Sequence, residues 1–195
     1  MPKSRGPRGR PPVASRELLQ EAAFELFLEQ GYEHTTVAHI AQRAGVGRST
    51  FFNHFDSKAD VFWTELDDAV TVLETHLKHP DAAGLNASRS ALLAAADTFG
   101  PDRVPFVLTQ YDLIGSPEEL QASAVARLAR IATTIENTLH TGDLGAGRAA
   151  AAAFALVAAS VAAARTWAGA GVERGPLTPY VRDATDPVFA GFSSS

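Results

Sequence analysis

Residues 48–55 combine hydrogen-bonding side chains with regularly spaced aromatic ones, in the order RSTFFNHF. Phe51 and Phe55 are four residues apart, so a helix here would place both on one face. The opposite face would then present side chains that donate to or accept from base edges and phosphates. These outward residues are Arg48, Ser49, Thr50, Asn53 and His54. The pattern predicts a surface that binds nucleic acid.

The residues before this stretch predict a helix-turn-helix. Thr36 is suited to cap a short helix over residues 37–44, and a second short helix is predicted over residues 48–54. Gly45 between them can take the left-handed conformation that a β-carbon would penalise, and Ala41 is small where the two helices would cross. Helical hairpins with a glycine turn also occur without any DNA-binding role. The polar face of the second helix favours DNA binding over such a plain hairpin.

The net charge of −5 hides an uneven distribution along the chain. Up to Lys58 there are eight Lys/Arg and six Asp/Glu residues, whereas the remainder has nine and sixteen. Four of the early cations lie within the first ten residues. A basic head on an acidic body suits a protein that presents one end to phosphates.

Residues 1–14 are rich in Pro, Gly and Arg and are predicted to form a flexible basic arm. The PRGRP sequence within this arm would place Arg8 and Arg10 along the floor of a narrow minor groove, where Gly9 allows close approach. A solvated tail without DNA contact is the alternative.

Apolar spacing predicts an all-α chain. One helix is expected over residues 16–30, after an N-cap at Ser15, and a longer one from Ser57 to residue 79, where Asp60 completes a capping box. Further helices are predicted near residues 86–98, 103–114, 117–140, 146–169 and 178–191. No segment shows the sustained period-two alternation of a half-buried strand.

Residues 16–62 resemble the DNA-binding domain of TetR-type regulators. The matching segments are AAFELFLEQGYEHTTV, IAQRAGV, STFFNHF and SKADVF, in the order and at the spacing of that family. The resemblance implies a three-helix DNA-binding domain over residues 15–56 and a C-terminal helical bundle over residues 57–195 that binds an effector and dimerises. It also implies a homodimer whose two third helices enter successive major grooves of a roughly palindromic operator on double-stranded DNA.

The resemblance further assigns DNA contacts residue by residue. It places Arg48, Ser49, Thr50 and Asn53 at bases or nearby phosphates, Phe52, His54 and Lys58 at the phosphate backbone, and Thr36, Val37 and His39 on DNA from the second helix. The family usually has tyrosine at the position of Phe52. Phenylalanine lacks the hydroxyl that donates to phosphate, so Phe52 is expected to make apolar contact only.

Aromatic residues of the C-terminal bundle are candidates for an effector pocket, since such pockets are mostly apolar with a few polar groups. A small, largely apolar effector would contact Trp63, Phe99, Phe106, Gln110, Tyr111, Phe154 and Trp167, unless these residues are ordinary core. His76, Arg127 and Arg130 could add polar contacts, although a surface arginine pair is the simpler interpretation. The effector is expected to move the fourth helix and so change the separation of the two recognition helices.

The alanine-rich segment 147–169 permits close helix–helix approach. Together with the final helix it could form a four-helix dimer interface, and ordinary intrachain core is the alternative. The apolar residues of that final helix are Tyr180, Val181, Val188, Phe189 and Phe192.

The sequence favours no catalytic function. It has no cysteine, no Gly-rich phosphate loop, no serine elbow and no His-Glu-x-x-His spacing, so no enzyme, metal site or cofactor is predicted. The apolar tract over residues 149–164 is shorter than the roughly 20 residues that span a bilayer, which predicts a buried helix in a cytoplasmic protein without membrane contact. Two alternatives remain open: an architectural DNA binder, and a TetR-like regulator or activator without small-molecule control.

Overall fold

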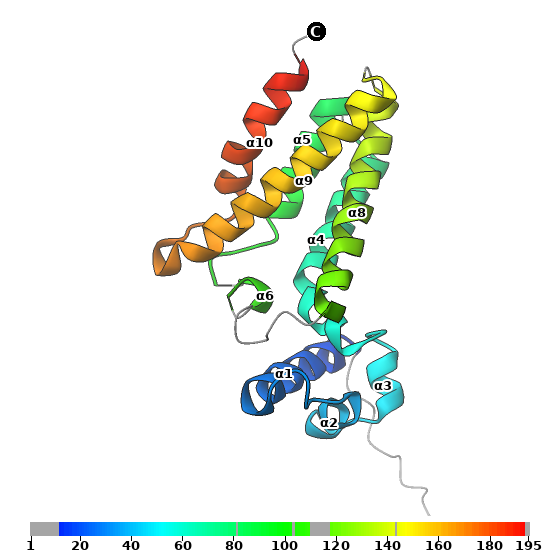
Figure 1. Ribbon diagram of the computed structural model, residues 1–195, viewed down its shortest axis with the longest axis vertical. Helices are drawn as coiled ribbons and strands as arrows, with labels where there is room; N and C mark the ends of the chain where they lie inside the picture. The colour runs from blue at the N-terminus through cyan, green and yellow to red at the C-terminus, as the bar shows by residue number, and fades with distance from the viewer. Residues whose placement is uncertain (1–11, 81, 103, 110–117, 143, 194–195) are drawn as a thin grey trace, which may run out of the picture. The chain divides into compact units, whose positions relative to one another are not determined.

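The computed structural model describes residues 12–80, 82–102, 104–109, 118–142 and 144–193, and within these ranges it contains helices and no strand (Figure 1). The predicted all-α fold is confirmed. Backbone contacts divide the chain into two compact units, one reaching to Phe62 and one beginning at Trp63. Each unit has its own buried core.

The described part of the first unit contains three α-helices: α1 (Pro12–Gln30), α2 (Val37–Arg43) and α3 (Arg48–Phe52). Helix α1 begins at Pro12, so the predicted N-cap at Ser15 is wrong and residues 12–14 are helical instead of part of an arm. Proline is favoured in the first helical turn because backbone N–H groups have no acceptor within the helix there, so the N–H that proline lacks is not missed. The helix ends before Gly31, whose φ of +83° is the left-handed conformation expected at a helix stop.

Aromatic rings fill the core of the first unit. Phe27 stacks on Phe62 with ring centroids 5.0 Å apart and planes inclined by 14°. Tyr32 lies 5.2 Å from Phe27, and Phe24 lies 5.6 Å from Phe62. This cluster joins α1 to the segment after α3, so the first unit extends to Phe62 and includes residues beyond position 56.

A 3₁₀-helix, η1 (Lys58–Trp63), precedes α4 (Thr64–Lys78) where the sequence predicted one continuous α-helix. The predicted capping box does form, because the backbone N–H of Ser57 donates to Asp60 Oδ2 at 2.8 Å. Residues 61–64, at the end of η1 and the start of α4, are all buried.

The second unit contains five α-helices besides α4 among the described residues. They are α5 (Gly84–Ala96), α6 (Phe106–Thr109), α8 (Glu118–His140), α9 (Ala146–Gly169) and α10 (Thr178–Ser193), with a short 3₁₀-turn, η2 (Gly171–Glu173), before the last. Of the helix predicted over residues 103–114, the described part is helical only in α6, which directly follows Pro105. Residues 103 and 110–117 lie outside the described ranges.

Helix α9 is central to the second unit and packs along both α8 and α10 (Figure 1). Ala149, Ala152, Ala153 and Leu156 are fully buried in it, and the small side chains allow neighbouring helices to come close. By length and composition α9 could cross a membrane, a test that core helices of soluble proteins also pass. One third of its most apolar window is buried within this chain.

A close backbone contact joins the start of α5 to the end of α8. A β-carbon at Gly142 would lie 2.9 Å from Cα of Gly84, and Gly84 itself has a φ of +52°. Both positions therefore require glycine, one for space and one for conformation.

Candidate nucleic-acid interface

Helices α2 and α3 meet at the tight turn that the sequence predicted. Thr36 caps α2 by accepting a hydrogen bond from the backbone N–H of His39 at 3.2 Å. Gly45 has a φ of +69°, and the N–H of Val46 donates to the carbonyl of Ala41 at 2.9 Å. The turn thus uses glycine where the backbone is left-handed and a small residue, Ala41, where α2 is buried.

Helix α3 has one buried face and one exposed face. Phe51 is fully buried and Phe55 nearly so, with their ring centroids 5.3 Å apart. Arg48, Ser49 and Asn53 are exposed, whereas Thr50 and His54 are half-buried. The helix itself ends at Phe52, but the N–H groups of Asn53 and His54 still bond to carbonyls of α3, so both residues continue its surface.

The predicted contacts from α2 lie at the start of that helix. Thr36 and His39 are exposed and Val37 is half-buried. His39 Nδ1 lies 3.4 Å from Gln30 Nε2, and the same Gln30 amide donates to Thr35 Oγ1 at 3.1 Å. These hydrogen bonds tie the beginning of α2 to the end of α1.

An arginine–carboxylate cluster holds α2 against α1. The Arg43 guanidinium donates to Glu29 Oε1 at 2.9 Å and Oε2 at 2.6 Å, and to Glu25 Oε2 at 3.0 Å. The hydrogen bonds from Arg43 lower the pKa of the Glu29 carboxyl, and those to both glutamates raise the pKa of Arg43. Both Glu29 and Arg43 therefore remain charged at neutral pH.

Lys58 makes hydrogen bonds within the first unit, a role that the sequence did not predict. Its Nζ donates to the carbonyls of Tyr32 at 2.9 Å and Thr35 at 3.2 Å, and it lies 3.9 Å from the centroid of the Tyr32 ring. Two of the three ammonium N–H donors are used there, because the loop after α1 has carbonyls that need donors. Lys58 thus fastens this loop to η1, and a phosphate contact stays a prediction for the remaining donor. Arg8 and Arg10 lie outside the described residues.

Among the described residues, those predicted to line an effector pocket lie in separate surroundings. Phe99 and Trp167 meet edge to face at 6.4 Å, but the Trp167 indole N–H donates to the carbonyl of Gly175 at 2.8 Å, so this ring belongs to the core. Trp63 is buried, with the Arg127 guanidinium 5.6 Å from its ring centroid. Phe106 is half-buried in α6, and Gln110 and Tyr111 lie outside the described residues.

Phe154 is 60% exposed, so its assignment to an internal pocket is wrong. Along α9 the residues Ala149, Ala153 and Leu156 face the core, and helical periodicity directs Phe154 to the other side. Its ring lies on the outer surface of the second unit.

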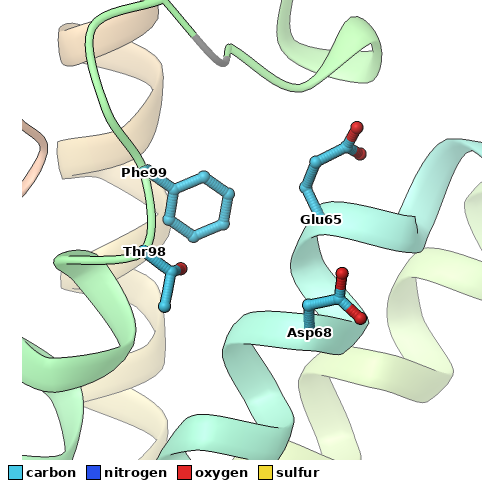
Figure 2. Close-up of a pocket in the computed structure, with 4 residues that line it drawn as sticks. All are labelled: Glu65, Asp68, Thr98 and Phe99. Carbon is cyan, nitrogen blue, oxygen red and sulfur yellow. The ribbon is translucent and has the colours of Figure 1, made fainter. Parts of the chain in front are cut away.

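A small cavity of about 60 Å³ opens between α4 and the residues after α5. It is lined by Glu65 and Asp68 of α4 on one side and by Thr98 and Phe99 on the other, as Figure 2 shows. Of these four residues only Phe99 was predicted. The spacing of three between Glu65 and Asp68 places them on one helix face, but nothing in the sequence indicates which neighbouring segment that face meets.

Arg127 and Arg130 hold carboxylates of their own chain. Arg127 Nε and Nη2 donate to the two carboxylate oxygens of Asp67 at 2.9 and 3.0 Å, while Arg130 lies 4.0 Å from Asp67 and 3.7 Å from Glu74. This cluster joins α4 to α8, which was not predicted. His76 is exposed, with Nδ1 3.0 Å from the carbonyl of Val72 on its own helix.

The final helix contributes to the core of its own chain. Val181 and Phe189 are buried, and Tyr180, Val188 and Phe192 pack against buried clusters of the second unit. These residues therefore contribute to the core of their own chain, and a dimer interface that includes α10 stays a prediction.

Comparison with known proteins assigns the chain to a family. Residues 19–62, which include α2, the turn and α3, match the model of bacterial regulatory proteins of the tetR family. The chain is also 30% identical over 152 residues to the HTH-type transcriptional activator FasR of Mycolicibacterium smegmatis, over 75% of this chain and 68% of FasR. The chain belongs to the TetR family. It is a transcriptional regulator, and α2, the turn and α3 form its helix-turn-helix.

Two further comparisons define how far the likeness of this TetR-family chain extends. The HTH-type transcriptional regulator TcmR of Streptomyces glaucescens is 48% identical over 65 residues, which are 33% of this chain and 29% of TcmR. The TetR-family repressor FadR of Thermus thermophilus, solved in complex with lauroyl-CoA, has a TM-score of 0.59 at 21% identity, over 90% of this chain and 94% of that one. The FadR likeness concerns the fold alone.

Proposed function

We propose that this TetR-family regulator binds a palindromic operator as a homodimer in the cytoplasm and is a repressor released by a small molecule. Helix α3 of each protomer enters the major groove of double-stranded DNA, and the residues at the start of α2 contact the same site. The observation that carries this proposal is the two-sided packing of α3. Its buried side is fixed by Phe51 and Phe55, so its outer side is rigid before DNA arrives.

The exposed side of α3 has the chemistry for both kinds of DNA contact. Arg48 can donate two parallel hydrogen bonds to guanine, and Asn53 can both donate to and accept from adenine. Ser49, Thr50 and His54 offer shorter polar groups at its edges. The exposed Thr36 and His39, with Val37, meet the adjoining phosphates from α2, and Arg8 and Arg10 reach the minor groove.

The outer face of α9 supports dimerisation. Ala151, Phe154, Ala158 and Ala162 are exposed at helical spacing of three and four residues, which makes an apolar stripe on the surface of this chain. Small residues beside one large ring suit close packing against the same helix of a second copy. A two-fold dimer of this kind matches the symmetry of a palindromic operator.

The effector is proposed to act through α4. The cavity near Phe99 is smaller than the 300 Å³ or more that a drug-sized ligand occupies, so such a ligand must displace its walls. Two of the four lining residues, Glu65 and Asp68, belong to α4, which follows directly from η1 of the first unit. Ligand entry therefore moves the helix that continues into the DNA-binding unit.

The sign of regulation is the point on which the relatives differ. FasR is named an activator, whereas FadR is described as a repressor. A promoter fused to a reporter distinguishes the two: repression predicts higher expression when the gene for this chain is deleted, and activation predicts lower expression.

Operator selection from random duplex DNA tests the proposal. The intact chain is expected to enrich one palindrome and to bind it with two protomers, as measured by gel shift and sedimentation. Arg48→Ala should weaken operator binding about tenfold or more, since a good base contact contributes roughly 1–3 kcal/mol. Lys78→Ala, which removes an exposed cation from the second unit, is the control and should leave affinity unchanged. Uniform coating of DNA without an enriched site would point to an architectural binder and sink the proposal.

A further inference from the structure

Phe52 exposes a large apolar surface in the middle of a polar face. Its side chain is 49% exposed, whereas Phe51 beside it is fully buried. Apolar surface in water is unfavourable, by roughly 25 cal/mol for each Å². On the face that is proposed to bind DNA, the exposed phenyl ring therefore offers apolar surface that a contact with DNA can cover.

The packing beneath Phe52 keeps the ring at the surface. It meets Phe51 edge to face, with centroids 5.5 Å apart and planes at 84°. Phe51 in turn packs on the nearly buried Phe55. The space below α3 is thus filled, so the Phe52 ring cannot turn inward and is presented in a defined orientation.

Phe52 lies among the residues that are proposed to read bases. Arg48 and Ser49 are four and three residues before it, one helical turn away on the same side, and both are exposed. Asn53 follows it and is exposed as well. A contact made by Phe52 is therefore expected at the base edges where these polar side chains bind.

The chemistry of the ring narrows what it can recognise there. Phenylalanine has no hydrogen-bond donor or acceptor, so it gains little from phosphate oxygens or from the polar edges of bases. The major groove offers one apolar group on a base edge, the C5-methyl of thymine. A phenyl ring and a methyl group can remove each other from water.

We propose that Phe52 is a specificity-determining residue that contacts the C5-methyl of one thymine in each operator half-site. The inference rests on the proposed binding of α3 in the major groove, and it moves Phe52 from the phosphate backbone to the base edge. Selection at that position comes from the methyl group and not from a hydrogen bond.

Deoxyuridine provides the test, because it differs from thymidine only in lacking the C5-methyl. In the selected operator each thymine is replaced singly by deoxyuridine, and affinity is measured by fluorescence anisotropy. One position per half-site should lose about fourfold in affinity, the value of one buried methyl, and about 15-fold when both half-sites are changed. Phe52→Ala should weaken binding to the thymine operator and bind the thymine and uracil forms equally at that position.

Two variants separate this contact from a general loss of stability or apolar surface. Phe52→Leu keeps an apolar side chain and should retain part of the thymine preference. Leu28→Ala removes a side chain that is 59% exposed on α1, and it should leave the thymine-to-uracil ratio unchanged. Circular dichroism establishes that each variant is folded.

The outcomes distinguish this inference from the proposed function. A selected palindrome in which no thymine is sensitive to uracil, or in which Phe52→Ala leaves that sensitivity intact, overturns the inference and leaves the operator proposal standing. Equal weakening of thymine and uracil operators by every Phe52 variant assigns the ring to sugar contacts and also overturns it. Failure to enrich any operator overturns both.

Discussion

The cores of the two units are built from side chains of different size. The first, with fewer residues, relies on stacked rings such as Phe27 on Phe62 and Phe51 on Phe55. The second relies on alanines of α9, among them Ala152 and Ala153, which are fully buried. A small domain buries a low fraction of its surface, so each buried residue must contribute much. Large rings meet that need and keep a short helix rigid, whereas alanines let long helices approach closely.

Removal of a core ring should have the largest effect, and only on the first unit. Phe51→Ala is expected to cost about 3–5 kcal/mol, which is comparable with the whole stability of a unit this small. Trp63 borders the first unit, so the measurement uses a Trp63→Phe background, in which the remaining Trp167 reports the second unit alone. Urea unfolding should therefore show an early loss of helical circular dichroism without an early change in fluorescence, together with loss of operator binding.

The neighbouring Phe52→Ala is the matched control for that measurement, because it deletes the same ring from the surface. It should unfold with the wild-type circular dichroism profile. An equal shift by both variants would show that the burial of Phe51 does not set the stability of the first unit.

Enlargement of an alanine should destabilise the second unit instead. Ala153→Leu forces a larger side chain into a fully buried site on α9 and is expected to cost about 1–3 kcal/mol or more. The unfolding midpoint followed by tryptophan fluorescence should shift to a lower urea concentration, while the helix-turn-helix remains folded. Ala129→Leu on α8 makes the same change at an exposed position and should have no such effect. If Ala153→Leu left the free energy of unfolding unchanged, close packing would not be the basis of this unit's stability.

The ion pair between α4 and α8 should have an intermediate effect. Arg127 and Asp67 are only 15% and 31% exposed, so their interaction is screened less than a surface pair. Arg127→Met is expected to cost about 1–3 kcal/mol, and a double-mutant cycle with Asp67→Asn should assign most of that cost to the pair. Arg130→Met, at a site that is 55% exposed, should change the unfolding free energy by less than about 0.5 kcal/mol. Additive effects of the Arg127 and Asp67 variants would contradict the pairing.

The smallest effect should be the pH dependence from Glu29. Arg43 lowers the pKa of this carboxyl in the folded state. The stabilisation is therefore fully present above the ordinary glutamate pKa of about 4.3, and it is lost as pH falls through the lowered folded value. The thermal unfolding midpoint of Glu29→Gln should lie slightly below that of wild type near neutral pH and coincide with it in strong acid. Glu33→Gln, an exposed change in the same unit, should track wild type throughout, and a difference that persists in acid would rule out the Arg43 contact as its cause.

The same contrast explains what could be predicted from the sequence. Helix-turn-helix geometry restricts residue type at Ala41, Gly45 and Phe51, so the pattern itself revealed α2, the turn and α3. Helix α9 was also predicted with the observed bounds, since Gly145 and Gly169 flank a long run of helix-forming residues. Local patterns of this kind depend on few distant contacts.

Features that depend on distant partners were not predictable in the same way. Periodicity showed that Glu65 and Asp68 share a helix face, but not that Thr98 and Phe99 lie opposite. The interaction of Lys58 with the loop after α1 depends on carbonyls 23 and 26 residues away. The aromatic residues Trp63, Phe106 and Phe154 looked alike in sequence, although their side chains are buried, half-buried and exposed respectively.

The six residues of η1 connect the first unit to the second along the chain. A 3₁₀-helix rises about 2.0 Å per residue and an α-helix about 1.5 Å, so rewinding this segment would shorten it by about 3 Å. Phe62 is locked into one core, and Trp63, the next residue, is buried at the start of the other unit. A change of winding in η1 would therefore change the length of the connection between two buried side chains that belong to different units.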